Sequence, residues 1–456
     1  MGLTIMIANI IVDTTKEHTR VPMDVATIEA AHRFHVYCAR FPSDIPIQAI
    51  QEYSKPGQTV FDPFCGSGTT LVAGLLLGRR VWGSDIDELA GLLSWTKTHP
   101  DDERSYKAFS DRSLKMLYET FESITPYMHD AALNAAGAEE FRVNGYCLSL
   151  PKKFPLTYWF PPKAVVGLAV IARFASRFRR KTFRAAAELA FSASIISKWP
   201  NTLSYAMDID HTRPHRKIRR IEFSKIFSMY SGRLDRVLSS LTALRHRYDE
   251  LGISKRLDRL AAVSAMDARK LNRLSDESVH LIVTSPPYFD AVDYPRSHRF
   301  SLCWLNRPVA SYSRYIGLHW NSKLNVDEWL SDRPALKRIL PEHVGAAPRK
   351  RIKWITFFED MRHSLQEMHR VLVPGGTAVC VIADNQAGGL SVAAHQAVIQ
   401  LGRECGFNLI HASKRAIEPR KRRFPAGPFG FDGPMRHEHV LVLRRPPRAT
   451  LRKSKG

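Results

Sequence analysis

Residues 59–70 read Thr-Val-Phe-Asp-Pro-Phe-Cys-Gly-Ser-Gly-Thr-Thr, and this stretch decides the fold class. A short apolar strand runs into a glycine turn at 62–68, and Thr69 to Leu77 then favours a helix that stops at Gly78. Residues 80–83 read Arg-Val-Trp-Gly and predict the next strand. Strand, glycine turn, helix and strand together indicate one half of a Rossmann-like, doubly wound α/β sheet.

The glycine turn has the features of a ligand-binding loop. Gly66 and Gly68 stand where a strand passes into a helix, so a ligand can approach the backbone without meeting a Cβ atom. Asp85 follows the next strand, where its carboxylate can accept hydrogen bonds from ribose hydroxyls. Position 71 is Leu, not the third glycine of a dinucleotide fingerprint, which disfavours a nicotinamide enzyme. A turn that only packs helix on strand is the alternative.

The rest of the chain divides into three blocks. The sequence from about residue 101 to 253 is largely helical and basic, and alternating strands and helices resume near residue 257. Asp267 follows one of these later strands and can accept a hydrogen bond from an adenine amine, although a solvated loop explains it equally well. We predict a sheet domain in two parts, 1–100 and 256–445, interrupted by a helical insertion, 101–255, and followed by a basic tail, 446–456.

A second loop carries residues suited to chemistry on a nucleobase. Residues 282–288 read Ile-Val-Thr-Ser-Pro-Pro-Tyr, so a predicted strand runs into a loop that two prolines make stiff. Ser285 and the Pro286 carbonyl can accept both hydrogens of an exocyclic amine, and Tyr288 can stack on the ring of a flipped base. The amine can then attack a sulfonium methyl directly, without a covalent intermediate or a metal. In isolation, a Ser-Pro-Pro-Tyr surface turn is the alternative.

The glycine loop and the Ser-Pro-Pro-Tyr loop together strongly resemble those of the amino-methylating DNA methyltransferases, which methylate cytosine N4 or adenine N6. Residues 35–42 look like the family's segment that closes over the methionine of the cofactor, 83–87 like its ribose strand, and 374–376 like a later turn. The resemblance implies a methyltransferase sheet, S-adenosylmethionine as cofactor and double-stranded DNA as substrate. The long insertion between the two loops departs from compact members and leaves the position of target recognition open.

The resemblance also assigns roles to residues. Serine before Pro-Pro-Tyr is typical of cytosine-N4 enzymes, whereas Asp or Asn points to adenine N6. The expected catalytic residues are Ser285, Pro286, Pro287 and Tyr288. The expected cofactor contacts are Asp62, Phe64, Gly66, Ser67, Gly68, Thr69, Asp85 and Asp267. No metal is expected, because no histidine pairs with cysteine or carboxylate at metal-ligand spacing.

Composition supports a polyanionic partner. The 456 residues carry 67 Lys and Arg against 44 Asp and Glu, a formal charge of +23, which suits contact with DNA phosphates, although a basic solvated surface is the alternative. The six cysteines form no Cys-x-x-Cys pair and fit a reducing cytoplasm. No apolar run reaches the length of a membrane span. A cognate restriction endonuclease is a conceivable partner that the enzyme does not need to bind.

Four basic clusters are candidates for DNA contact: 173–184, 213–220, 349–353 and 414–423. In the first, Phe174, Phe178 and Phe183 better fit the buried face of an amphipathic helix. The segment after Tyr288, with Asp293, Tyr294, Arg296 and His298, is expected beside the flipped base. A transfer-RNA methyltransferase and a catalytically dead DNA-binding protein are the alternative functions. The former usually has Asp before Pro-Pro-Tyr and a longer N-terminal domain.

Overall fold

The protein was analysed as a computed structural model. It describes residues 23–37, 40–135, 138–152, 155–197, 201–206, 214, 221–289, 293–318, 324–339, 348–387, 390–417 and 437–448. Among the described residues, no helix is both long and apolar enough to cross a membrane.

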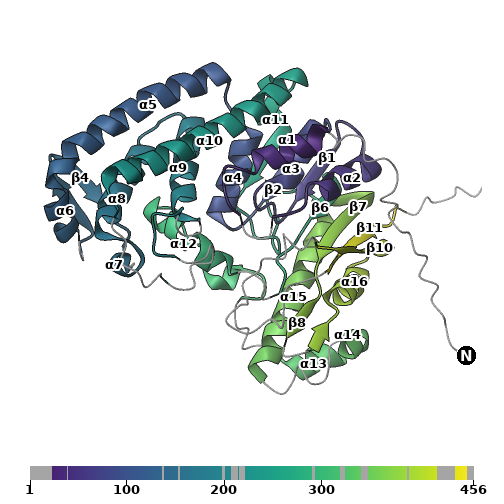
Figure 1. Cartoon of the computed structure of the whole chain (residues 1–456). Helices are drawn as coiled ribbons and strands as arrows, with labels where there is room; N and C mark the ends of the chain where they lie inside the picture. Colours follow the sequence, from purple (N-terminus) through teal and green to yellow (C-terminus); the bar gives the residue numbers. More distant parts are fainter. Residues whose placement is uncertain are drawn as a thin grey trace, which may run out of the picture.

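A seven-stranded sheet forms the centre of one half of the molecule (Figure 1). Its strands are β1 (Thr59–Asp62), β2 (Arg80–Ser84), β5 (Ala261–Ser264), β6 (Val279–Thr284), β7 (Leu372–Ile382), β10 (Asn408–Ala416) and β11 (His437–Arg444). They lie in the order β10-β11-β7-β6-β1-β2-β5, and β11 runs antiparallel to both β10 and β7, while the other neighbouring pairs are parallel. The predicted Rossmann-like α/β fold is therefore confirmed.

Alternate residues of the central strands point to two different cores. Val60, Leu281 and Val283 pack with α1 (Met23–Ala31), α2 (Asp44–Tyr53) and α3 (Thr69–Leu76). Phe61 and Ile282, which alternate with them, pack with α15 (Pro348–Val371) and α16 (Ala394–Glu404). This alternation with a period of two is required of parallel strands that are covered on both faces.

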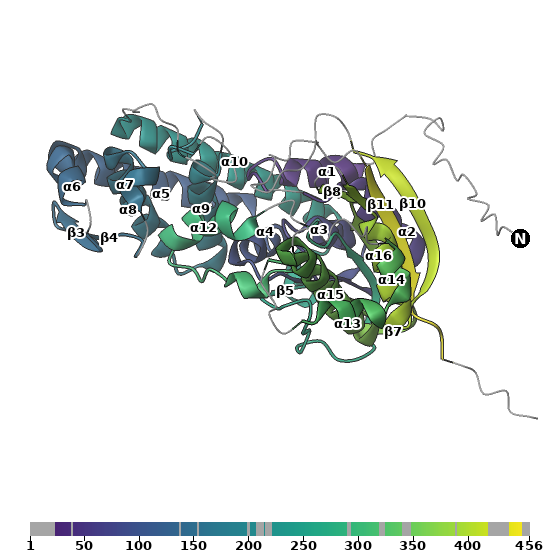
Figure 2. The same ribbon diagram turned by 90° about the horizontal axis from the view of Figure 1, so that it is seen from below.

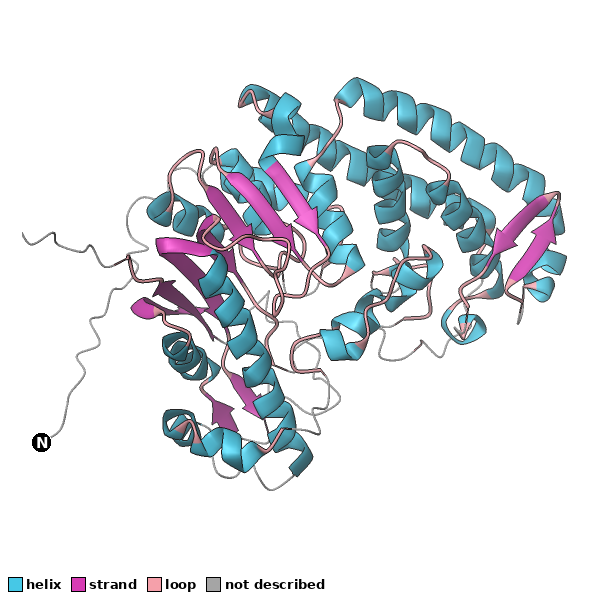
Figure 3. Ribbon diagram, turned by 180° about the vertical axis from the view of Figure 1, so that it is seen from behind, coloured by secondary structure: helices cyan, strands magenta, loops and turns pink. Residues whose placement is uncertain are grey.

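A helical insertion lies beside the sheet, as Figures 1 and 3 show. Its elements are α5 (Glu103–Ile124), the 3-10 turn η1 (Thr125–Tyr127), α6 (Met128–Asn134), β3 (Glu140–Val143), β4 (Tyr146–Ser149), α7 (Leu156–Trp159), α8 (Pro162–Ser176), α9 (Lys181–Ile195) and α10 (Phe223–Glu250). These elements share a core of their own with α4 (Glu88–Thr98) and α12 (Tyr294–Trp304). The view in Figure 2 shows the insertion extending away from the sheet.

The remaining elements are short. They are η2 (Ser254–Arg256), α11 (Leu257–Leu260), η3 (Tyr312–Arg314), α13 (Val326–Ser331), α14 (Pro334–Ile339), β8 (Asn385–Ala387) and β9 (Leu390–Val392). Within the block predicted to be largely helical, the stretch from Val165 to Arg184 forms most of α8 and the start of α9.

Candidate active site

The two predicted loops meet at the switch point of the sheet. From β1 the chain proceeds to β2 and β5 on one side and returns to β6 on the other side, so β1 and β6 are neighbours. Ligands of doubly wound proteins bind at the carboxyl ends of such a strand pair. Thr284, at the end of β6, donates a 2.6 Å hydrogen bond to the Asp62 carboxylate at the end of β1. The glycine loop and the Ser-Pro-Pro-Tyr loop are thus tied together at their bases.

The glycine loop needs both of its glycines. Gly66 (φ 47°) and Gly68 (φ 84°) have the left-handed backbone that side chains other than glycine rarely adopt. A Cβ atom at Gly68 would lie 2.9 Å from Oγ and 3.0 Å from Cα of Ser94, and one at Gly66 would lie 3.1 Å from the Tyr37 ring. Ser94 also donates a 2.8 Å hydrogen bond to the Gly66 carbonyl. The loop is held rigidly between α4 and Tyr37.

A cavity opens above this loop. Among the predicted site residues, Asp62, Phe64, Gly66, Ser67, Thr69, Asp85, Asp267, Ser285 and Pro287 line it. Gly68, Pro286 and Tyr288 are not among the described residues that line it, since Gly68 faces Ser94 and Pro286 is buried. One cavity therefore brings together most of the cofactor loop and part of the catalytic loop.

Two buried carboxylates in the cavity have unusual acidity. Burial raises the pKa of Asp85 to about 7, despite hydrogen bonds from the backbone N–H groups of Asp87 and Gly66, each 3.0 Å long. Burial likewise raises the pKa of Asp62 to about 6, although Thr284 donates to it. A ligand hydroxyl that donates to Asp85 would favour its ionised form.

Asp267 lies in a different electrostatic environment. Burial raises its pKa, but the Arg269 side chain and backbone N–H outweigh burial and hold that pKa below its ordinary value. Arg269 donates to Asp267 at 2.7 Å and to Asp360 on α15 at 2.7 Å. The solvated-loop alternative does not describe Asp267, because this residue is only partly exposed, lines the cavity and is fixed by Arg269.

A buried lysine supports the glycine loop, and the sequence did not predict this role. The Lys97 ammonium, 2 % exposed, donates to the Ser67 carbonyl at 2.8 Å and contacts His32 Nδ1 at 2.7 Å. Burial lowers the pKa of Lys97 well below its usual value. A lysine on a helix is ordinarily a solvated residue, so its sequence position gave no signal of this role.

The segment after the catalytic loop is placed differently from the prediction. Tyr294, the first residue of α12, lines the cavity, with its ring centroid 6.2 Å from that of Tyr37. His298 is fully buried and bonds Asp87 at 2.9 Å, while Tyr315 donates to the same carboxylate at 3.1 Å. His298 therefore cannot contact a base directly, and its part of the prediction was wrong. It anchors α12 to the loop that carries Asp85.

The Tyr288 side chain is turned toward β11. Its hydroxyl accepts a hydrogen bond from Ser285 Oγ and donates one to Glu438, each 3.3 Å long. Glu438 is 5 % exposed and also pairs with Arg415 of β10 at 3.2 Å. Glu438 was not among the predicted site residues, because it is 150 positions from Tyr288 and only the sheet brings the two together.

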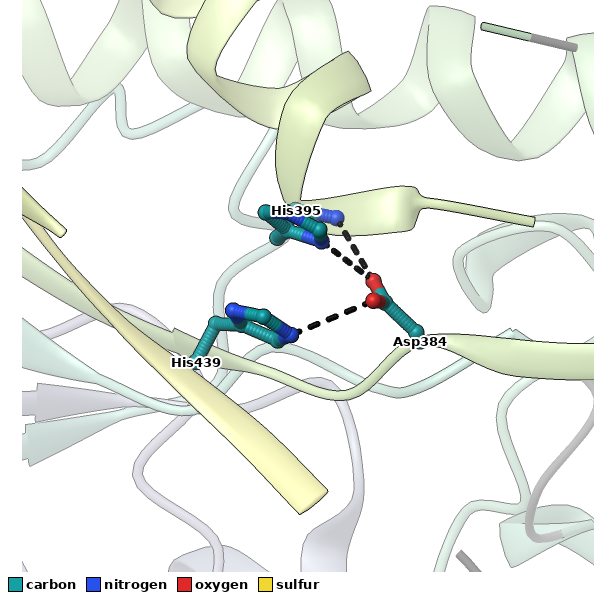
Figure 4. A group of neighbouring side chains, drawn as sticks. All are labelled: Asp384, His395 and His439. Carbon is teal, nitrogen blue, oxygen red and sulfur yellow. Dashed lines mark hydrogen bonds and ion pairs between the residues drawn. The ribbon is translucent and has the colours of Figure 1, made fainter. Parts of the chain in front are cut away.

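Asp384, His395 and His439 form a polar cluster (Figure 4). The Asp384 carboxylate bonds His395 Nδ1 at 2.6 Å and His439 Nε2 at 3.1 Å, and the three ligand atoms lie within 4.8 Å of one another. This composition suits a divalent metal. However, the two imidazole rings are stacked, with centroids 3.7 Å apart and planes inclined by only 2°, so a single ion cannot lie in both ring planes. In this arrangement the cluster links the end of β7, α16 and β11 through hydrogen bonds.

The structure bears on the predictions for the four basic clusters to different degrees. Phe174, Phe178 and Phe183 pack against the insertion core, as the amphipathic interpretation predicts. Cluster 213–220 lies outside the described residues except for position 214, and 418–423 lies outside them entirely. Within 349–353, which belongs to the start of α15, Lys353 lies 5.6 Å from the Phe289 ring. Arg415, in the fourth cluster, pairs with Asp44 and Glu438 and is therefore not a free solvated charge.

The cavity fits S-adenosylmethionine. The glycine backbone leaves no Cβ at Gly66, Tyr37 covers that position, and a buried carboxylate stands at the end of the adjacent strand. These features suit a nucleoside joined to an amino acid, with the carboxylate at the ribose position. This strand order, with a glycine loop and a carboxylate at the switch point, is typical of S-adenosylmethionine-dependent methyltransferases.

Comparisons with known proteins identify similar DNA methyltransferases. A family model described as DNA methylase, of the N6 and N4 type, matches residues 11–90. The type II methyltransferase M.MvaI of Kocuria varians is 22 % identical over 418 residues, which cover 88 % of this chain and 87 % of that protein. These matches support the resemblance of the chain to the amino-methylating DNA methyltransferases.

Other relatives match smaller parts. The type II methyltransferase M.BsoBI of Geobacillus stearothermophilus is 21 % identical over 287 residues, which cover 61 % of this chain and about half (53 %) of that protein. The structure of a DNA modification methylase from Thermus thermophilus in complex with S-adenosyl-L-methionine is 22 % identical, with a TM-score of 0.22, and the match covers 40 % of this chain and 53 % of that chain.

Proposed function

We propose that the protein transfers a methyl group from S-adenosylmethionine to N4 of cytosine in double-stranded DNA. The observation that carries this proposal is Ser285, which lines the same cavity as the glycine loop and follows the strand next to it. Serine at this place resembles the cytosine-N4 enzymes. Bound S-adenosylmethionine supplies an electrophilic methyl group on a sulfonium, and the protein has to present an amine to it.

The residues of the cavity divide this work. Asp85 holds the ribose hydroxyls, Asp267 accepts from the adenine amine, and the glycine loop with Tyr37 encloses the methionine part. Ser285 Oγ and the Pro286 carbonyl accept the two amine hydrogens of a flipped cytosine. These hydrogen bonds draw the nitrogen lone pair out of conjugation with the ring. The nitrogen could then attack the methyl group that bound S-adenosylmethionine would supply, without a covalent enzyme intermediate.

Recognition of the DNA sequence falls to the helical insertion, 101–255, in this proposal. The insertion has its own core and contacts α4, which follows β2, and α12, which follows the catalytic loop in the chain. Lysine and arginine side chains on such a module can contact phosphates while a few side chains read base edges. A restriction endonuclease of the same specificity fits this function but is not required for it.

Nucleoside mass spectrometry tests the proposal. Unmethylated DNA is incubated with the protein and methyl-labelled S-adenosylmethionine, then digested to nucleosides. Label in N4-methylcytosine is the expected result, and label in N6-methyladenine would replace cytosine by adenine as the target. Label only in transfer RNA would move the substrate to RNA. Cofactor binding without label in any nucleic acid would indicate a DNA-binding protein that has lost catalysis.

A further inference from the structure

A directed chain of hydrogen bonds leads away from the catalytic loop. Ser285 Oγ donates to the Tyr288 hydroxyl, and the Tyr288 hydroxyl donates to Glu438 Oε2, over 3.3 Å in each case. Both bonds have the same direction, from the cavity toward β11. With its proton committed to Tyr288, Ser285 has its lone pairs available to accept from a substrate amine.

The far end of this chain is a buried carboxylate. Glu438 is 5 % exposed, and its second oxygen, Oε1, pairs with the Arg415 guanidinium at 3.2 Å. Arg415 also contacts Asp44 at 3.0 Å, so one cation lies between two carboxylates. Burial and the neighbouring Glu438 raise the pKa of Tyr288 well above its usual value, so its phenol stays neutral and can only pass a proton on.

Methylation of an amine creates a proton that has to leave. When the nitrogen attacks, the N–C bond forms, the C–S bond breaks with its electron pair going to sulfur, and the nitrogen becomes positively charged. It returns to a neutral methylamine by losing one of its two original hydrogens. General bases positioned for such a transfer contribute about 10²–10⁴-fold to a rate.

We propose that Glu438 accepts this proton through Tyr288 and Ser285. This inference rests on the proposed amine methylation. The amine proton moves to Ser285 Oγ, the serine proton to the Tyr288 oxygen, and the tyrosine proton to Glu438 Oε2. Charge and protons balance, because a cationic nitrogen and a carboxylate become a neutral amine and a carboxylic acid. Glu438 contacts no substrate itself and acts through Tyr288.

Other carboxylates near the loop are committed elsewhere. Asp62 accepts from Thr284, and both oxygens of Asp384 accept from histidines, while within the described part of the chain neither carboxylate bonds Ser285 or Tyr288. The relay also explains why residue 288 carries a hydroxyl, since stacking on a base requires only the aromatic ring. A phenylalanine could stack equally well, but it could not pass on a proton.

Single-turnover methyl transfer on unmethylated DNA tests the relay with three variants. Glu438→Gln and Tyr288→Phe should each slow the step about 10²–10⁴-fold, while the Kd for S-adenosylmethionine changes less than about twofold. The double variant should be no slower than the slower single variant, because both changes interrupt one path. Tyr312→Phe is the matched control, since it removes a 3.3 Å tyrosine–carboxylate bond, to Asp293, away from the relay.

The outcomes separate the possibilities. A wild-type rate in Tyr288→Phe, which keeps the ring and should fold normally, would overturn the relay. Multiplicative losses in the double variant would overturn it too, because the two residues would then act independently. Equal slowing in Tyr312→Phe would show that the losses are not specific to this path. If the unmodified enzyme labels no base amine, the proposed function itself fails, and the relay fails with it.

Discussion

Substitution of Asp85 by asparagine should change how cofactor affinity depends on pH. The side chain keeps its size but loses the ability to ionise, and the pKa of Asp85 is raised to about 7 by burial. Ribose hydroxyls donate to the carboxylate more strongly when it is ionised, so cofactor binding lowers this pKa and releases a proton. Affinity of the unmodified enzyme should therefore increase as the pH rises through 7.

The size of this effect follows from the titration. With a pKa of about 7, roughly a tenth of Asp85 is ionised at pH 6 and roughly nine tenths at pH 8. If only the ionised form binds well, the apparent Kd scales with the inverse of that fraction and is about tenfold weaker at pH 6. At pH 8 the variant should bind about 10- to 100-fold more weakly, because a hydrogen bond to a charged group contributes about 1.5–3 kcal/mol.

Equilibrium dialysis with labelled S-adenosylmethionine at pH 6, 7 and 8 measures both proteins. The α-amino group of the cofactor also titrates in this range, at about 7.7–8.0, but it does so with both proteins. The ratio of the two Kd values therefore isolates Asp85. A ratio that stays constant from pH 6 to pH 8 would refute the titration of Asp85, and equal affinities at pH 8 would refute its contact with the ribose.

Further substitutions test the two loops and the contact with DNA. Gly68→Ala should lower the free energy of unfolding in urea by about 2–5 kcal/mol, which is the sum of left-handed backbone strain and the clash with Ser94. Gly57→Ala, where φ is 81° and the surrounding space is open, should lower it by only about 1–2 kcal/mol. Equal losses in the two variants would exclude the clash with Ser94. Thr284→Val should lower the free energy of unfolding by about 1–3 kcal/mol at pH 8, because it removes a hydrogen bond to the ionised Asp62 carboxylate. The loss should be smaller below pH 6, where Asp62 is protonated, and a loss independent of pH would contradict this. Ser285→Ala should slow methyl transfer about 100-fold with little change in cofactor Kd; equal losses would make the loop structural. DNA affinity should fall about 10³-fold or more between 50 and 200 mM salt if six or more phosphates are contacted, and a flat salt response would rule out phosphate contacts.

The sequence predicts the parts of the site that depend on local chemistry. Gly66, Gly68 and Asp85 could be assigned because a tight turn and a strand-end carboxylate have fixed spacings along the chain. The order of the strands could not be predicted in this way, because it depends on pairings such as Val60 with Leu281 across more than 200 residues. The family resemblance supplied the cofactor that local spacing alone left open.

Residues that act through distant partners escaped prediction for a physical reason. Polar residues are usually solvated, so His298 appeared suited to DNA contact and Lys97 gave no signal. In the structure both are buried, and each bonds a partner that only the fold brings near, Asp87 for His298 and the Ser67 carbonyl for Lys97. Burial of a polar group is costly without such a partner, so these residues mark where the fold uses polar contacts to hold the site.

The distribution of these contacts explains why the cofactor loop can be rigid before any ligand arrives. Ser94 bonds the Gly66 carbonyl, Lys97 bonds the Ser67 carbonyl, and Thr284 bonds Asp62 at the start of the turn. Two of these supports come from α4 and one from β6, so no single element holds the loop. A loop fixed in this way loses little conformational entropy on binding, and its affinity depends mainly on direct contacts. For that reason, substitution of Asp85 should lower the affinity for S-adenosylmethionine, whereas substitution of Lys97 should first lower the free energy of unfolding.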